Sequence, residues 1–230
     1  IALSVFLVLL VTPSFSFWST GHMIVSRIAY EEIKNKDPSL LAKIQSEIDV
    51  LKQYSKEKDH SFVESAVWAD DNKEIAFNAM DGWHFMNTPV IDPDFHDDIY
   101  KEKMNVSWSI YQMKSTLTNK NKPSFDSNLA LSFAWRYLIH LVGDIHQPLH
   151  ASTYYSKQFP SGDKGGNDFK LVYPDNKDIT NLHALWDACV DQYGSMFAPL
   201  NSTEWSALSA FAFNLTSVYP RLKVQDRVSV

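Results

Sequence analysis

The chain has 230 residues, of which 45% are hydrophobic and 21% are charged, and this globular composition excludes an intrinsically disordered protein. Its single cysteine excludes an intramolecular disulfide and a metal site built from several thiolates. The formal net charge of −6 gives no basic surface for binding nucleic acid through its phosphates, so any phosphate site must take positive charge from another source.

The first 16 residues have the pattern of a targeting segment. Residues 1–16 are uncharged, and their apolar run at 5–11 is shorter than the roughly 20 residues that a membrane-spanning helix needs. Small residues follow the run, so we predict a secretory signal peptide that is cleaved after Ser16 and leaves Phe17 as the new N-terminus. The alternatives are an N-terminal membrane anchor and a buried core helix.

Three Asn-x-Ser/Thr sequons agree with passage through the secretory pathway. They begin at Asn105, Asn201 and Asn214. We therefore expect glycosylation at these positions, in a protein that is secreted or held in an acidic vesicular compartment. After removal of the signal peptide we expect a monomer with no stable membrane association.

Apolar residues recur at helical spacing along most of the remaining chain. They predict helices over residues 24–33, 38–51, 62–79, 99–117, 125–146, 182–190 and 203–218. The segment 125–146 is apolar around much of its circumference, so we place it at the centre of a bundle, and Pro148 ends it. Turn signals predict a short β-hairpin or extended loop around residues 156–180, with an extended piece at 169–173. The fold class is therefore mainly α, a single-domain helical bundle over residues 17–230.

Polar residues inside the predicted central helix indicate a metal site. His140 and Asp144 are four residues apart and therefore lie on the same face of the helix, about one turn from each other. A carboxylate buried there costs several kcal/mol unless a partner or a metal ion neutralises it. His150 follows just after the break at Pro148, where the chain can fold back toward the same place.

The same residue types recur elsewhere in the chain. His183 and Asp187 repeat the four-residue spacing, Asp70 and His84 lie beside large apolar residues, and His22 follows the predicted N-terminus. A single histidine in such a setting is more often a hydrogen-bonded core residue than a ligand. Five histidines and three aspartates together, without cysteine, form the donor set that is typical of catalytic zinc.

Six motifs carry a resemblance to a known family. They are Trp18-Ser-Thr-Gly-His22, Trp68-Ala-Asp70, Trp83-His84-Phe85, His140-Leu-Val-Gly-Asp144-Ile-His-Gln-Pro-Leu-His150, Gly165-Gly166-Asn167 and Asn181-Leu-His183-Ala-Leu-Trp-Asp187. In content and order they resemble the S1/P1 nuclease family over roughly residues 17–190. The resemblance implies the helical fold that this family shares with the zinc-dependent bacterial phospholipases C. Members usually contain disulfides and continue with further helices after the position of Val230, so we expect a domain with truncated C-terminal helices.

The resemblance implies a cluster of three zinc ions. The first ion would be held by Asp70, His84, His140 and Asp144. The second would be held by His150, His183 and Asp187. The third would be held by His22, a shared Asp144 oxygen, and the amino and carbonyl groups of Phe17. Family members usually begin with Trp, so cleavage before Trp18 is the alternative, and only the correctly cleaved chain would bind the third ion.

The resemblance also implies roles in catalysis and substrate binding. Zinc would supply the positive charge that the acidic chain lacks and would lower the pKa of the attacking water to near neutrality. We assign Asp70, Asp144 and Lys73 to catalysis, and Lys73 stands where the family commonly has Arg. Phe85 is expected to stack on the base beside the scissile bond. Asn87 stands where the family commonly has an Asp that contacts the base.

The resemblance therefore implies a secreted zinc-dependent endonuclease that hydrolyses phosphodiester bonds of single-stranded RNA and DNA to 5′-phosphorylated products and removes 3′-phosphates from nucleotides. The alternative enzyme is a zinc-dependent phospholipase C. The spacing of His140, Asp144 and His150 and the aromatic residue after His84 favour the nuclease. A third interpretation is a non-catalytic secreted helical protein with structural zinc, which the lack of a Cys-rich site disfavours.

Overall fold

The computed structural model describes residues 17–73, 79–118 and 125–220, so the expected signal peptide at 1–16 lies outside the described residues. The α-helices are α1 (Ser19–Lys36), α2 (Pro38–Ile48), α3 (Ser61–Glu64), α4 (Trp68–Lys73), α5 (Val106–Thr118), α6 (Phe125–His146), α7 (Pro148–Ala151), α8 (Leu182–Asp187) and α9 (Ser202–Val218). The 3-10 helices are η1 (Asp49–Tyr54), η2 (Ser65–Val67), η3 (Asp81–His84) and η4 (Cys189–Asp191), and the strands are β1 (Thr88–Ile91) and β2 (Ser152–Tyr155). The prediction of a mainly α fold is confirmed. No helix in the described ranges has the length and apolar character to span a membrane.

Two helices begin at caps that the local sequence specifies. At the start of α2, the Asp37 carboxylate accepts a hydrogen bond from the Leu40 backbone N–H (2.9 Å), and Pro38 occupies the first helical position. At the start of α9, the Asn201 side chain accepts from the Glu204 N–H (3.0 Å), and the Glu204 carboxylate accepts from the Asn201 N–H (2.9 Å). This reciprocal pair is a capping box.

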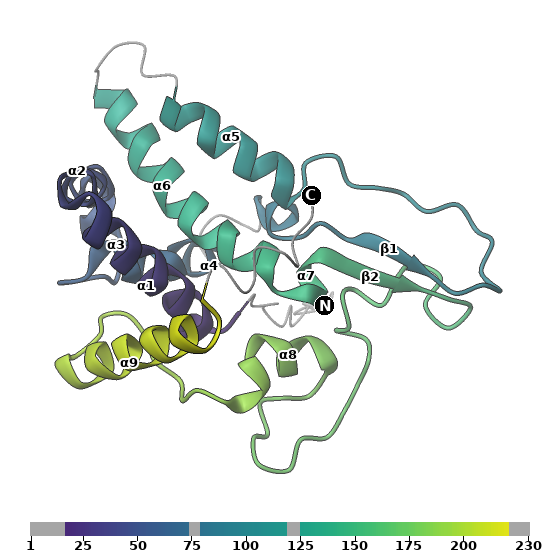
Figure 1. The fold of residues 1–230 in the computed structure, drawn as a ribbon. Helices are drawn as coiled ribbons and strands as arrows, with labels where there is room; N and C mark the ends of the chain where they lie inside the picture. Colours follow the sequence, from purple (N-terminus) through teal and green to yellow (C-terminus); the bar gives the residue numbers. More distant parts are fainter. Residues whose placement is uncertain (1–16, 74–78, 119–124, 221–230) are drawn as a thin grey trace, which may run out of the picture.

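Helix α6 passes through the middle of the fold, as predicted (Figure 1). One buried apolar cluster lies between α6 and its neighbour α5 and contains Leu141 and Met113. A second cluster is shared by α1, α2 and α9 and contains Met23, Ile44 and Leu208. Because both clusters pack against α6, this helix has a fixed place relative to the elements on either side.

A buried ion pair attaches α6 to the segment that follows η1. The guanidinium of Arg136 is fully buried, and it donates to the Glu57 carboxylate (2.7 Å) and to the Ile48 carbonyl (2.9 Å). The Ser132 hydroxyl donates to the same carbonyl (2.7 Å). Since an unpaired buried charge costs several kcal/mol, these contacts fix the position of α6 relative to the end of α2.

The helix predicted at residues 62–79 is not continuous. It consists of α3, η2 and α4, and residues 74–78 lie outside the described residues. The Ser65 hydroxyl donates to the Phe62 carbonyl (3.0 Å) where α3 gives way to the tighter 3-10 turn. The break turns the following segment, so that α4 directs its polar end toward α6.

Four other helices differ from their predicted bounds. Helix α1 extends beyond the predicted 24–33 at both ends, and α2 ends at Ile48 and not at residue 51. The helix predicted at 99–117 begins at Val106, because the Asn105 side chain accepts a hydrogen bond from the backbone three residues on (3.1 Å) and caps α5. The helix predicted at 182–190 ends as α8 at Asp187, and the next three-residue turn, η4, contains left-handed backbone.

A two-stranded sheet is the feature of the fold that the sequence did not predict. Strands β1 and β2 pair in parallel along their full length and extend to one side of the bundle (Figure 1). Residues 156–180 form the expected extended loop, with an antiparallel bridge between Lys170 and Asn181. The extended piece predicted at 169–173 is therefore part of that loop, and its backbone bonds to the end of the loop through Phe169 and Leu171 on either side of the bridge.

Candidate metal centre

Eight buried histidines and aspartates from six elements meet beside the C-terminal half of α6. They are His22 (α1), Asp70 (α4), His84 (η3), His140 and Asp144 (α6), His150 (α7), and His183 and Asp187 (α8). Each of them is at most 8% exposed. The structure thus brings together all the side chains that the sequence analysis proposed as metal ligands.

Their donor atoms form three groups in which all ligand atoms lie within 4.8 Å of one another. The groups are His22, His140 and Asp144; Asp70, His84 and His140; and His150, His183 and Asp187. His140 belongs to the first two, so these two groups are adjacent, and the third lies next to them because His150 Nδ1 is 3.6 Å from Asp144 Oδ1. This arrangement has the number of sites that the resemblance implied.

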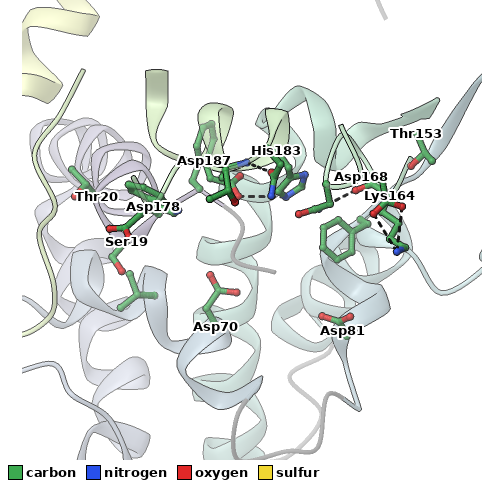
Figure 2. Close-up of a pocket in the computed structure, with 18 of the residues that line it drawn as sticks. Ser19, Thr20, Asp70, Asp81, Thr153, Lys164, Asp168, Asp178, His183 and Asp187 are labelled. Carbon is green, nitrogen blue, oxygen red and sulfur yellow. Dashed lines mark hydrogen bonds and ion pairs between the residues drawn. The ribbon is translucent and has the colours of Figure 1, made fainter. Parts of the chain in front are cut away.

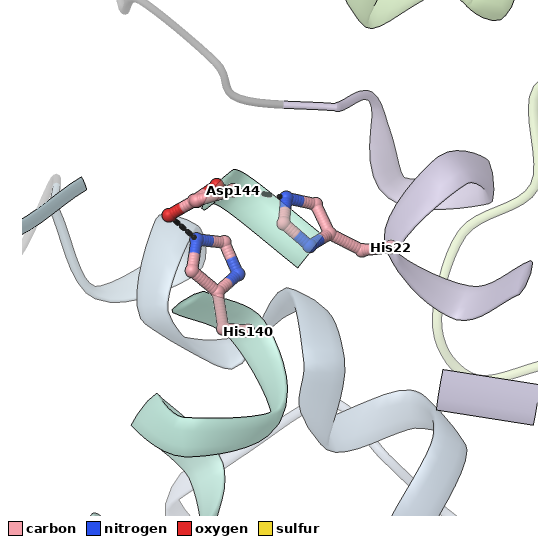
Figure 3. A group of neighbouring side chains, drawn as sticks. All are labelled: His22, His140 and Asp144. Carbon is pink, nitrogen blue, oxygen red and sulfur yellow. Dashed lines mark ion pairs between the residues drawn. The ribbon is translucent and has the colours of Figure 1, made fainter. Parts of the chain in front are cut away.

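Asp144 lies at the junction of the groups. One carboxylate oxygen is 2.8 Å from His84 Nδ1 and 3.1 Å from His140 Nε2, and the other is 3.4 Å from His22 Nε2. Figure 3 shows the contacts with His140 and His22. Burial disfavours the charged carboxylate, but His140 and His84 hold the pKa of Asp144 well below its usual range. Its two oxygens therefore face different groups while the side chain stays ionised.

The third group lies between α7 and α8. His183 Nε2 is 3.4 Å and His150 Nε2 is 3.9 Å from oxygens of the Asp187 carboxylate. The two imidazole rings are stacked, with their centroids 4.9 Å apart. Because His183 and Asp187 are one helical turn apart on α8, the spacing seen in the sequence gives this pairing directly.

Backbone carbonyls orient three of the imidazoles. The Nδ1 atoms contact carbonyl oxygens at 2.6 to 2.9 Å, His140 to Ala66, His150 to His84, and His183 to Gly165. A carbonyl only accepts, so each Nδ1 carries the proton and each Nε2 keeps its lone pair. This is the orientation in which a histidine typically binds a metal ion.

The residues fit a divalent cation. Among the described residues, Asp144 Oδ1, His150 Nε2 and His183 Nε2 are buried without a hydrogen-bond partner. Leaving such acceptors unsatisfied costs about 1–3 kcal/mol each, and a bound cation removes that cost. Imidazole nitrogen and carboxylate oxygen are the ligands that zinc accepts in sites without cysteine.

Burial favours the neutral imidazole in most of the cluster. It lowers the pKa of His22, His84 and His183, and it lowers the pKa of His150 to about 3. The neutral form is the one that coordinates metal. Burial has the opposite effect on a carboxyl group and raises the pKa of Asp187 well above its usual range, whereas a nearby cation favours the ionised form.

Gln147 supports the third group, and the sequence analysis did not assign it. Its side chain is fully buried, and its amide nitrogen donates to Asp187 Oδ1 (2.7 Å). Its amide oxygen accepts from the Leu149 N–H (2.5 Å) and caps α7, the helix of His150. Since one end of the amide must accept and the other donate, Gln147 links the positions of α7 and Asp187. The signal in the sequence was Pro148, because proline favours the first position of a helix and so places Gln147 at the cap.

A cavity of about 900 Å³ opens onto this cluster (Figure 2). Asp70, His183 and Asp187 line it, whereas the other five proposed ligands are not among its lining residues. A small molecule in the cavity can therefore contact three of the eight proposed ligand side chains directly.

Both residues proposed for substrate binding line the cavity. The Phe85 ring lies with its centroid 4.6 Å from that of His150. Asn87 has a positive φ of 50°, and its side-chain oxygen accepts a hydrogen bond from the Thr153 hydroxyl (2.9 Å). Phe85 and Asn87 are thus held beside the third group.

Lys73 is directed toward a proposed ligand. Its Nζ is 2.9 Å from Asp70 Oδ1 and 5.9 Å from the Phe85 ring centroid, and Lys73 is not among the cavity-lining residues. Burial lowers the pKa of Lys73, but the negative charge of Asp70 and its neighbours raises it by more. The pKa of Lys73 is therefore above its usual value. Asp70 and Lys73 are three residues apart on α4, so the sequence alone allows this ion pair to be predicted.

The first described residues lie at the edge of the cluster. The Phe17 ring packs edge-on to His22 with centroids 6.1 Å apart, and Phe17 and Trp18 line the cavity. The Trp18 N–H donates to the Asp187 carbonyl (2.9 Å). This hydrogen bond joins the start of the described chain to the end of α8.

The three sequons differ in exposure. Asn214 is exposed on α9, and Asn201 is exposed at the cap of the same helix. Asn105 is half-buried, and its side chain caps α5. All three are at or near the surface.

Comparison with known proteins agrees with this geometry. "Endonuclease 2" of Arabidopsis thaliana is 28% identical over 183 residues, which are 76% of this chain and 57% of that protein. "Endonuclease 1" of the same plant is 28% identical over 189 residues, 79% of this chain and 56% of that protein. "Nuclease S1" of Aspergillus oryzae is 28% identical over 123 residues, 53% of this chain and 39% of that protein. The chain spans about half the length of the curated relatives it matches.

The match to a protein family covers nearly the whole chain. Residues 17–229 match the S1/P1 Nuclease family. The match begins at Phe17 and includes all eight donors of the candidate metal centre. The chain therefore belongs to the S1/P1 nuclease family.

Proposed function

We propose that this protein is a secreted zinc-dependent endonuclease. It hydrolyses phosphodiester bonds of single-stranded RNA and DNA, leaves 5′-phosphorylated products and removes 3′-phosphates from nucleotides. The observation that carries the proposal is the convergence of eight buried donors in three adjacent groups beside one cavity. Family membership supports the same reaction.

Zinc is the proposed cofactor, with three ions per chain. When bound, zinc supplies positive charge to phosphoryl oxygens and lowers the pKa of water to near neutrality. The proposed ligands are Asp70, His84, His140 and Asp144 for one ion, His150, His183 and Asp187 for another, and His22, Asp144 and the Phe17 amine and carbonyl for the third. The protein's contribution is to hold these donors in fixed directions, through the carbonyl contacts of its imidazoles and through Gln147.

The other assigned residues bind the substrate and orient a metal ligand. Phe85 offers a ring for stacking with a base, and such stacking tolerates any base sequence. Asn87 contacts the base through its amide. Lys73 holds Asp70 by the ion pair and adds positive charge near the phosphate. Asp70 and Asp144 belong to the catalytic machinery because they bind the metal.

The position of the N-terminus depends on processing. Cleavage after Ser16 frees the amine of Phe17, whose ring already packs against His22. The hydrogen bond from the Trp18 N–H to Asp187 supports this register over cleavage before Trp18. Passage through the secretory pathway also makes Asn105, Asn201 and Asn214 available for glycosylation. We propose that the processed protein is a monomer without stable membrane association.

The test of the proposed function compares Asp144→Ala with Asp178→Ala. Asp178 lines the cavity but belongs to none of the three donor groups, so it is a matched control. On denatured DNA, Asp144→Ala abolishes hydrolysis and loses more than one zinc per chain, because its carboxylate serves two groups. Asp178→Ala keeps both. Elemental analysis gives the zinc content, and N-terminal sequencing verifies processing.

Two outcomes contradict the proposal. A folded and correctly processed protein that binds no zinc removes the proposed cofactor. Hydrolysis of phosphatidylcholine vesicles in place of denatured DNA indicates a phospholipase C with the same cluster.

Phe85→Ala separates substrate binding from metal binding. The variant raises the Kd for a nucleotide by about tenfold or more, because one base–aromatic stack is lost. Its zinc content stays at the wild-type value, since Phe85 donates no ligand atom. Phe85→Trp keeps the stack and serves as the conservative control. Loss of zinc in Phe85→Ala contradicts the stacking role.

A further inference from the structure

The cavity extends to both sides of the metal groups. In Figure 2, Ser19 and Thr20 lie on one side, Thr153 and Lys164 lie on the other, and Asp187 and His183 lie between them. Phe85 lies toward the Thr153 side, because the N–H of the next residue, Met86, donates to the carbonyl of His150, and β2 begins two residues later at Ser152. The Thr20 side has no assigned role.

A second aromatic residue, Phe197, lines the cavity on the Thr20 side. The Thr20 hydroxyl accepts a hydrogen bond from the Met196 N–H (2.8 Å) and donates to the Gly194 carbonyl (2.9 Å). These two bonds fix the backbone just before Phe197 to the first turn of α1. Phe197 therefore directly follows a residue, Met196, whose backbone is fixed beside the cavity.

The segment around Phe197 is anchored on both sides. Met196 and Leu200 are buried in the core that α1, α2 and α9 share. The Leu200 N–H donates to the carboxylate of Glu64, which is itself buried (2.9 Å). Between these anchors Phe197 is 66% exposed. Phe197 is thus an exposed side chain in a segment that packing and hydrogen bonds hold in place.

An exposed ring in a cavity offers a flat apolar face to a ligand. Exposed apolar side chains that face a cavity commonly mark binding sites. A single strand that crosses the metal groups has bases on both sides of the bond that is cut, and every base has a face for stacking. Phe17 and Trp18, which directly precede Ser19 and Thr20 in the chain, also line the cavity and add to its aromatic character.

We infer that Phe197 stacks on the base across the scissile bond from the base that Phe85 binds. The chain would then hold single-stranded nucleic acid between two aromatic side chains, one on each side of the metal centre. This inference rests on the proposed nuclease function and extends it to a second base-binding subsite. A duplex cannot present two neighbouring unpaired base faces, so two such subsites also favour single strands.

The experiment uses two substrates that differ in whether they reach Phe197. Thymidine 3′-monophosphate has one base and occupies the Phe85 side only, whereas a short oligothymidylate places bases on both sides. The processed, zinc-loaded protein is compared with Phe197→Ala, Phe197→Trp and the control Phe213→Ala. Phe213 is 70% exposed on α9 and does not line the cavity.

Phe197→Ala raises KM for the oligothymidylate by about tenfold and leaves KM for the mononucleotide unchanged. Phe197→Trp retains the wild-type KM for both substrates, and so does Phe213→Ala. Fluorescence anisotropy with a labelled phosphorothioate oligothymidylate gives the same loss of affinity for Phe197→Ala, independently of turnover. Zinc content and melting temperature match those of Phe213→Ala.

Three outcomes overturn the inference. Equal KM changes for both substrates mean that Phe197 shapes the whole site. An unchanged KM for the oligothymidylate in Phe197→Ala, with an active wild type, removes the subsite and leaves the proposed function intact. A change in oligomer mass without a change in KM assigns the ring to contact between two copies of the chain. If the zinc-loaded wild type neither binds nor cleaves either substrate, the proposed function fails as well.

Discussion

Gly143 is the residue that lets the His22 ring approach α6. A Cβ added at this position would lie 2.5 Å from His22 Nδ1 and 2.9 Å from His22 Cε1, which is closer than real contacts allow. The ring belongs to a buried group with His140 and Asp144, so it has little room to move away. The absence of a side chain at residue 143 is therefore part of the candidate metal centre.

Gly143→Ala is expected to weaken zinc binding at the His22 group without unfolding the protein. Alanine favours a helix over glycine by about 1 kcal/mol, so the substitution alone stabilises α6. Displacement of the ring lowers the zinc content by one ion per chain at limiting zinc, measured by elemental analysis. Gly194→Ala is the control, because its added Cβ has no neighbour within 4 Å. Three tightly bound ions in Gly143→Ala would contradict this role.

At the residue scale, contacts within one helix could be predicted from the spacing of residues in the sequence, and contacts between elements could not. The pairs His140–Asp144 and His183–Asp187 follow from the four-residue repeat, and the structure brings both to the cluster. The Asp70–Lys73 ion pair could also have been predicted from the three-residue spacing, but Lys73 was assigned to catalysis without this contact. The bond from Gln147 to Asp187 joins residues 40 apart. Only the fold reveals that bond.

At the element scale, helix α9 depends on its capping box. Asn201 accepts hydrogen bonds from two backbone N–H groups of the first turn, and this residue is also the start of a sequon. A substitution here therefore has two separable effects, on the helix terminus and on glycosylation. The two can be distinguished because Asp caps a helix as well as Asn does.

Asn201→Ala is expected to destabilise the protein, and Asn201→Asp is not. Loss of the cap costs about 1 kcal/mol, which lowers Tm by about 2–4 °C in a protein of this size. Asn201→Asp keeps the cap and removes the sequon, so it isolates the contribution of a glycan. Thermal unfolding by circular dichroism measures both variants. Equal losses in Tm for the two would assign the effect to the glycan and not to the cap.

Elements with local signals were predicted, and elements made by long-range pairing were not. Helices α2, α6 and α9 were predicted, because the helical spacing of each is contained in a short stretch of sequence. Strands β1 and β2 have four residues each and lie about 60 residues apart. Neither strand is long enough to show a recognisable alternation of apolar and polar residues. The break between α3 and α4 has a similar origin, because burial of η2 in the core outweighs the helical spacing.

At the scale of the whole molecule, the candidate metal centre joins elements that are too short to be stable alone. Helices α4, α7 and α8 have four to six residues each, and isolated helices of that length do not persist in water. Each of them carries a proposed ligand, as does η3. With a single cysteine, the chain has no internal disulfide to hold these segments together. Bound metal would therefore serve as the cross-link between them.

Removal of the metal is expected to lower the stability of the folded protein as well as its activity. A ligand that binds only the folded state at a hundred times its Kd contributes about 2.7 kcal/mol per site, which corresponds to a change in Tm of about 5–11 °C here. Chelation with EDTA followed by thermal unfolding measures this change, and added zinc restores it. Asp144→Ala is the matched control, because a chain that already lacks more than one ion loses less on chelation. The same Tm with and without EDTA would mean that packing of Leu141, Met23 and their neighbours alone maintains the fold, and that the cluster of imidazoles and carboxylates contributes no cross-link.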